Sequence, residues 1–108
     1  MSRVQLALNV SNIDAAVDFY SKLFGTEPAK RRPGYANFAI VEPPLKLVLI
    51  ENSSAAGSIN HLGVEVESSE KVMEASNRLQ EANLEITPEN KTTCCYALQD
   101  KVWLKDPD

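Results

Sequence analysis

Residues Gln5–Val10 (Q-L-A-L-N-V) and His61–Val66 (H-L-G-V-E-V) are two copies of one alternating stretch, 56 positions apart in the sequence. Apolar side chains occupy every second position in both, which is the pattern of a half-buried β-strand. The opposite face carries Arg3, Gln5, Ala7 and Asn9 in the first copy and His61, Gly63 and Glu65 in the second. This repetition predicts a chain built from two copies of one structural unit.

Each of these strands is followed by an amphipathic segment with residues typical of helix starts and helix ends. We expect the first helix to begin at Ser11-Asn12 and to end at Gly25. We expect the second to begin at Ser68-Ser69 and to end near Asn83. Each copy therefore opens as a strand followed by a helix.

More strands follow each helix. The first copy predicts strands at about 26–31, 35–41 and 45–51, and the second predicts strands at about 92–98 and 101–105. A turn is expected at Gln99-Asp100, between the last two. The fold class is thus α+β, with paired βαβββ modules at about 1–52 and 59–108 in one domain spanning residues 1–108. The last strand of the second module is expected to be missing from this chain.

Composition limits the function classes. The formal net charge of −4 argues against nucleic acid or an anionic membrane as the partner. No apolar stretch approaches the 18 residues typical of a membrane span. We therefore expect a cytoplasmic protein whose thiols are kept reduced.

The only two cysteines, Cys94 and Cys95, are adjacent. Consecutive Cα atoms lie about 3.8 Å apart, which is shorter than an ordinary disulfide spans, so a bond between them would be strained. Two neighbouring thiolates suit one soft atom, although a pair in a buried strand is the alternative. Neighbouring side chains of a regular strand point to opposite faces, so we expect Thr92–Tyr96 to be a mobile loop or irregular strand. Lys91 and Lys101 are close enough in sequence to lower the thiol pKa values.

Gln5 and His61 are equivalent positions of the repeat. A sheet covered by helices on one side leaves its other face as a concave surface, where these two side chains are expected to meet. The helices are expected to cover Leu6, Leu8, Leu62 and Val64. An amide and an imidazole form two-thirds of a facial metal site. The alternatives are a hydrogen-bonded strand histidine and a solvent-facing glutamine.

Four segments carry a resemblance to a known family: Tyr35–Ile40, Pro43–Leu49, Asn60–Val66 and Thr92–Ala97. With the paired βαβββ pattern, the chain resembles the vicinal-oxygen-chelate superfamily of glyoxalase I, extradiol dioxygenases and bleomycin-resistance proteins. More specifically, these segments are similar to the ArsI/CadI group of Fe(II)-dependent C–As bond lyases and cadmium-induced proteins.

The resemblance implies roles for particular residues. Gln5 and His61 match two of three metal ligands, and the third, a glutamate, is expected beyond Asp108. Glu51 and Glu65 are the candidates to replace it within the chain. Cys94 and Cys95 match the pair that binds trivalent arsenic. The implied cofactor is Fe(II), for which Ni, Co or another divalent metal substitutes in crystals.

The implied function is oxygen-consuming cleavage of trivalent organoarsenicals, such as methylarsenite and aromatic arsenicals, to arsenite. The partners would be the organoarsenical and O₂, with no nucleic acid and no membrane, and with a homodimer as an open alternative. The competing function is a non-catalytic soft-metal or drug-binding resistance protein of the cadmium-induced type. A glyoxalase-type isomerase ranks lowest, because it uses four protein ligands and needs no adjacent thiols.

Overall fold

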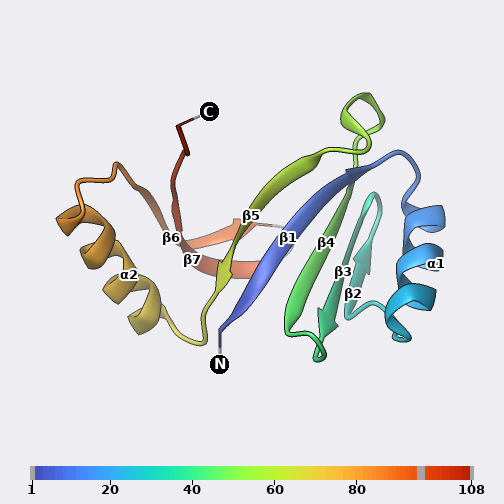
Figure 1. The fold of residues 1–108 in the computed structure, drawn as a ribbon, viewed down its shortest axis with the longest axis horizontal. Helices are drawn as coiled ribbons and strands as arrows, with labels where there is room; N and C mark the ends of the chain where they lie inside the picture. The colour runs from blue at the N-terminus through green and yellow to red at the C-terminus, as the bar shows by residue number, and fades with distance from the viewer. Residues whose placement is uncertain (1, 95–96, 108) are drawn as a thin grey trace. The chain divides into compact units, whose positions relative to one another are not determined.

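The computed structural model describes residues 2–94 and 97–107 of the chain. The chain forms two compact units, Met1–Glu65 and Val66–Asp108, and each is described by itself. Figure 1 shows their helices and strands. The division falls after the first strand of the second predicted module, so that strand belongs to the first unit.

The described part of the first unit, residues 2–65, contains one α-helix, one short 3₁₀ helix and five strands. In chain order these are β1 (Arg3–Val10), α1 (Ile13–Phe24), β2 (Lys30–Arg32), β3 (Tyr35–Ile40), β4 (Leu45–Glu51), η1 (Ser53–Ala55) and β5 (Ile59–Glu65). The elements from β1 to β4 have the predicted βαβββ order, which is therefore confirmed for the first module.

The five strands form one sheet in the order β2-β3-β4-β1-β5. Strand β1 runs parallel to β4 and antiparallel to β5, and it lies between them (Figure 1). The first strand of each copy of the repeat thus meets the other directly. This pairing places the polar faces of β1 and β5 side by side.

Helix α1 packs over β3 and β4 on one face of the sheet. Asn12 caps its start by accepting a hydrogen bond from the Ala15 amide, and Gly25 ends it with a positive φ of 65°. The core beneath it consists of Val17, Ala36, Phe38, Ile40, Leu47 and Leu49. Burying each large apolar side chain contributes about 1.5–3 kcal/mol, so this face holds the unit together.

The apolar residues of β1 and β5 have different surroundings. Leu6 and Leu8 pack against the core, as predicted. Leu62 and Val64 are exposed to 67% and 68%, and α1, the helix of this unit, does not cover them. The reason is the strand order, because β5 lies at the edge of the sheet and α1 packs over β3 and β4.

The second unit contains α2 (Ser69–Glu81), β6 (Thr87–Cys94) and β7 (Ala97–Trp103), with the two strands paired antiparallel. The predicted helix ends are confirmed, since the Ser68 hydroxyl accepts from the Lys71 amide and Asn83 has a φ of 65°. The predicted turn at Gln99-Asp100 is wrong, because both residues lie within β7.

The strand β6 also begins earlier than predicted, at Thr87. Glu89 holds this part of the hairpin together: it accepts a hydrogen bond from the Trp103 indole at 3.0 Å and pairs with Lys101 at 3.4 Å. Cross-strand contacts of this kind stabilise the hairpin, although its polar sequence shows no clear strand pattern.

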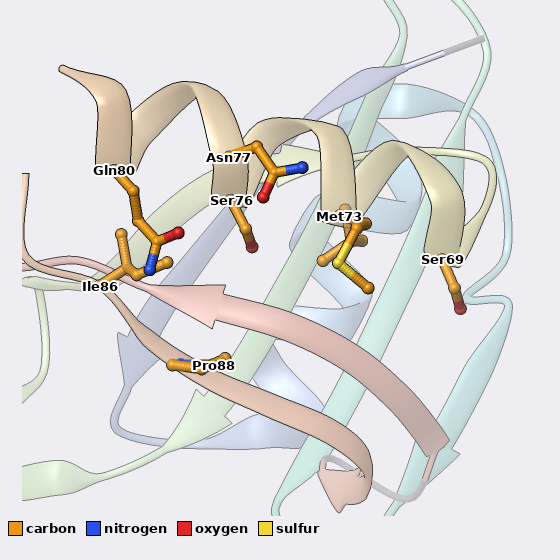
Figure 2. A pocket seen from close by; sticks show the side chains of 8 residues that line it. Ser69, Met73, Ser76, Asn77, Gln80, Ile86 and Pro88 are labelled. Carbon is orange, nitrogen blue, oxygen red and sulfur yellow. The ribbon is translucent and has the colours of Figure 1, made fainter.

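A hollow of about 260 Å³ lies beneath α2, against the start of β6. In Figure 2, Gln80 extends from the helix toward Ile86, and Ser76 and Met73 project from the same side of the helix. None of the side chains that line the hollow is titratable, so it offers no acid, base or charged ligand. Among the described parts of the chain, no helix is long and apolar enough to cross a bilayer.

Candidate metal centre

Gln5 and His61 lie on neighbouring antiparallel strands of the first unit. In the register of β1 and β5, Gln5 pairs with Gly63, and Ala7 pairs with His61. The two side chains are therefore diagonal neighbours, a separation that long side chains bridge. Nε2 of Gln5 and Nε2 of His61 are 3.4 Å apart. The predicted meeting of these two side chains is thus observed.

A β-bulge lies beside His61. Ala7 pairs with His61 and Leu8 pairs with Ile59, so Asn60 is an extra residue of β5 between the two pairs. In a regular strand Asn60 and His61 would point to opposite faces. Here Oδ1 of Asn60 lies 2.8 Å from Nδ1 of His61. Bulges often re-aim a side chain next to a functional site, and this one places an asparagine behind the imidazole.

His61 is also a hydrogen-bonded strand histidine, which was the alternative to a metal ligand. Its Nδ1 side contacts Asn60 and its Nε2 side contacts Gln5. A metal-binding histidine ordinarily has this arrangement, with one ring nitrogen held by a hydrogen-bond partner and the other directed at the metal. The hydrogen bonds of His61 therefore support a ligand role as much as a structural one.

Glu65, a candidate for the third ligand, already pairs with two cations. Its Oε1 lies 2.5 Å from Nε of Arg3, and its Oε2 lies 2.8 Å from Nζ of Lys46. Partial burial raises the pKa of Glu65, but hydrogen bonds and charges from Lys46 and Arg3 outweigh burial and hold that pKa below its ordinary value. Both carboxylate oxygens thus serve ion pairs on the polar face.

Glu51, the other candidate, is in the wrong place. Its Oε2 accepts a hydrogen bond of 2.8 Å from the Ile13 amide at the start of α1. It pairs with Val10 in the register of β1 and β4, on the face covered by the helix. A carboxylate there stabilises the positive end of the helix dipole and does not reach the polar face.

The site therefore offers two neutral ligands. Gln5 and His61 converge from adjacent strands, and amide oxygen and imidazole nitrogen are both suitable donors for a divalent transition metal. Within residues 2–94 and 97–107, no group of three His, Cys, Asp or Glu side chains gathers as a metal site. The residues present thus fit two positions of a facial site, while the third ligand stays a prediction.

The cysteine pair lies at the end of β6. Cys94 is the last residue of that strand and pairs with Ala97, whereas Cys95 and Tyr96 fall outside the described residues. Of the two alternatives predicted for Thr92–Tyr96, a mobile loop or an irregular strand, Thr92–Cys94 take the strand and pair with β7. A register break does occur in β6, between Glu89 and Thr92, just before this segment.

Lys101 does not sit beside Cys94 in the hairpin. It pairs with Glu89, five positions before Cys94 in β6, and roughly 15 Å along a strand. Its ammonium group lies 3.4 Å from the Glu89 carboxylate and 4.9 Å from the centre of the Trp103 ring. Register thus sets Lys101 apart from Cys94 along the hairpin, while Cys95 falls outside the described residues, so the effect of Lys101 on the thiol pKa values stays a prediction.

Comparisons with known proteins agree with this fold. The sequence profile of the Glyoxalase/Bleomycin resistance protein/Dioxygenase superfamily matches residues 3–108. A solved structure titled as an NAD-dependent benzaldehyde dehydrogenase from Legionella pneumophila is similar with a TM-score of 0.58 and 22% identity, over 90% of this chain and 85% of that one. At this identity the likeness concerns the fold alone.

Two curated relatives are much more similar in sequence. The cadmium-induced protein CadI of Mycobacterium tuberculosis is 63% identical over 107 residues, which cover 99% of this chain and 70% of the relative. The trivalent organoarsenical cleaving enzyme of Thermomonospora curvata is 63% identical over 108 residues, which cover 99% of this chain and 72% of the relative. The chain therefore belongs to the glyoxalase/bleomycin resistance protein/dioxygenase superfamily, in the group that contains these two proteins.

Proposed function

We propose that this protein is an Fe(II)-dependent, oxygen-consuming C–As bond lyase that cleaves trivalent organoarsenicals to arsenite. The observation that carries the proposal is the approach of Gln5 and His61 to 3.4 Å on adjacent strands. The relative from Thermomonospora curvata, named for cleavage of trivalent organoarsenicals, supports the substrate class.

Gln5 and His61 would hold the metal. Members of this superfamily commonly bind a divalent metal. When bound, Fe(II) would supply a redox-active centre with open positions for O₂ and substrate. Gln5 would present its amide oxygen, since rotation of the amide exchanges its oxygen and nitrogen. Both ligands are neutral, so the predicted carboxylate beyond Asp108 would reduce the net charge of the centre.

Cys94 and Cys95 would hold the substrate. Thiolates bind trivalent arsenic well, and two of them would fix the arsenic while leaving its organic substituent free to approach the metal. Fixing the substituent in this way removes part of the entropic barrier to the reaction. The thiols therefore act by binding and orienting the substrate, and the chemistry takes place at the metal.

Incubation with methylarsenite tests the proposal. Protein loaded with Fe(II) should convert methylarsenite to arsenite in air and should not do so without oxygen. The His61→Ala variant should be inactive in both conditions, whereas Gln80→Ala, which changes an exposed glutamine of α2, should match the wild type. Arsenite production by the His61→Ala variant in air would refute the proposed role of this site.

A non-catalytic soft-metal binder is the second candidate. It is favoured by the relative CadI, which is named as cadmium-induced and is as similar to this chain as the lyase is. Such a protein would hold Cd(II) or arsenite through Cys94 and Cys95 without turnover. Unchanged methylarsenite in air, together with retained Cd(II) binding, would favour this candidate. A single domain, a cytoplasmic location and a homodimer stay predictions.

A further inference from the structure

Four hydrogen bonds link the imidazole of His61 to a backbone carbonyl. His61 contacts Oδ1 of Asn60 at 2.8 Å, and Nδ2 of Asn60 donates to Oδ1 of Asn9 at 3.0 Å. Nδ2 of Asn9 donates to Oγ of Ser58 at 2.9 Å, and that hydroxyl donates to the Ala55 carbonyl at 2.5 Å. The series runs from the metal centre to the end of η1, entirely within the first unit.

The direction of this series is fixed at its far end. A backbone carbonyl accepts a hydrogen bond and cannot donate one. The Ser58 hydroxyl therefore donates its only proton to the Ala55 carbonyl. Its oxygen must therefore accept from the amide nitrogen of Asn9. The amide oxygen of Asn9 then faces Asn60, which must present its own amide nitrogen there. The amide oxygen of Asn60 is left facing Nδ1 of His61.

The same logic assigns the proton of the neutral imidazole. Nδ1 meets an acceptor, so the proton belongs on Nδ1, and Nε2 carries the lone pair. Nε2 is the nitrogen that lies beside Gln5. The opposite tautomer would set two lone pairs against each other at Asn60 and would leave no lone pair on Nε2 for a metal.

The β-bulge is what makes the contact between Asn60 and His61 available. Because Asn60 is the extra residue of β5, its side chain lies on the same side as His61 and Asn9. Asn9 is nearly buried, with 6% of its surface exposed, and its backbone pairs with Gly57 and Ser58. The series is thus anchored in the sheet and in the segment that follows η1.

We infer that Asn60 is a positioning residue which, through Asn9 and Ser58, fixes the tautomer of His61 so that Nε2 is the metal-binding nitrogen. The metal-binding part rests on the proposed function, whereas the tautomer does not. Partners that hold a ligand histidine typically change metal affinity by about 10–100-fold when they are lost. Loss of Asn60 should therefore weaken metal binding without removing a ligand.

The tautomer can be read directly, because His61 is the only histidine in the chain. In protein labelled with ¹⁵N-histidine and kept metal-free at alkaline pH, the two ring-nitrogen signals should show the proton on Nδ1. In Asn60→Leu the signals should move toward the opposite tautomer, and in Asn60→Asp, which keeps an acceptor, they should not. Ser58→Ala, which does not touch the ring, should produce an intermediate change.

Titration with Ni(II) adds the second readout. Asn60→Leu should bind Ni(II) about tenfold more weakly or worse, Asn60→Asp should retain affinity, and Asn77→Ala on α2 should match the wild type. Thermal melts of all variants identify any that fail to fold. If Asn60→Leu fails to fold, the tautomer of the wild type and the intermediate change expected for Ser58→Ala keep the inference testable. A wild-type proton on Nε2, or an unchanged tautomer in folded Asn60→Leu, would overturn the inference. Ni(II) affinity unchanged in His61→Ala would instead overturn the proposed metal site and leave the tautomer assignment standing.

Discussion

Gln5 stands directly opposite Gly63 in the register of β1 and β5, so no side chain from β5 lies across from the amide. A Cβ built at Gly63 meets no atom within 4 Å. Space is therefore open on the polar face beside the candidate ligands. His61, two residues before Gly63, reaches Gln5 from the diagonal position.

The open space predicts a size limit at position 63. Gly63→Ala should fold as well as the wild type or be more stable by up to about 1 kcal/mol, because alanine loses less entropy than glycine in a strand. Gly63→Phe should also fold, but its ring should occupy the space beside Gln5 and weaken Ni(II) binding. Chemical unfolding and Ni(II) titration of both variants measure the two effects. Full Ni(II) affinity in a folded Gly63→Phe protein would show that the metal does not use this space.

The two candidate ligands should differ in their contribution to metal binding. His61→Ala should abolish tight Ni(II) or Fe(II) binding, since imidazole is the stronger donor for these metals. Gln5→Ala should weaken binding less, with little change in unfolding temperature for either variant. Metal analysis after dialysis gives the stoichiometry, and Gln80→Ala is the matched control. Unchanged stoichiometry in His61→Ala would contradict the site.

The thiols should govern arsenical capture. Cys94→Ser and Cys95→Ser should each remove binding of phenylarsenite, because a single thiolate binds arsenic more weakly than two. The stability of both variants should stay close to that of the wild type. Thr93→Ser in the same strand is the control. Titration of each variant with phenylarsenite, alongside thermal melts, gives the answer. Wild-type affinity in either serine variant would end the thiol-pair hypothesis.

Glu65 should stabilise the fold in a pH-dependent manner. Its pKa is held below the ordinary 4.5, so its stabilisation is complete above that value and is lost as the pH falls through the lowered pKa. At neutral pH, Glu65→Gln should lose about 1 kcal/mol, a modest figure because solvent screens a partly exposed pair. In acid below the lowered pKa the two proteins should unfold alike. Urea unfolding at both pH values provides the test, and an equal difference at both would exclude the ion pairs as its source.

Glu51 should behave as a helix-capping residue. Glu51→Ala should cost from a few tenths to about 1 kcal/mol of stability, since the Ile13 amide loses its acceptor and the dipole of α1 its counter-charge. Ni(II) binding should not change. A fall in Ni(II) affinity without a fall in stability would restore Glu51 as a candidate ligand.

The sequence was sufficient for the order of elements and for the meeting of Gln5 with His61. Alternation and helix caps are local signals, and the repeat relates two strands that turn out to be neighbours. The alternating pattern of the two strands also placed Arg3 and Glu65 on the polar face. Only the register shows that these two residues pair. The two strands of the β6–β7 hairpin were predicted too late in the chain. Cross-strand contacts of Glu89 hold the start of the hairpin in place, and no local turn motif in the sequence marks that start.

Asn60 could not have been found from the sequence. Alternation assigns neighbouring residues of a strand to opposite faces, so Asn60 is expected to point away from His61. The bulge that reverses this expectation depends on pairing with β1, more than fifty residues earlier in the chain. A local sequence pattern cannot predict such a long-range pairing, because the pairing forms only in the complete sheet.

The position of β1 between β4 and β5 has a consequence for the order in which the protein assembles. The pairing of β3 with β4 links segments close in the sequence, whereas β1 must join β4 and β5 from the far end of the chain. Contacts between distant segments form slowly, because long loops must close first. Gln5 and His61 therefore meet only when β5, whose sheet partner is β1, has paired with it. A newly synthesised chain would have no metal-binding pair until that late step, and capture of the ion would then oppose the departure of β1.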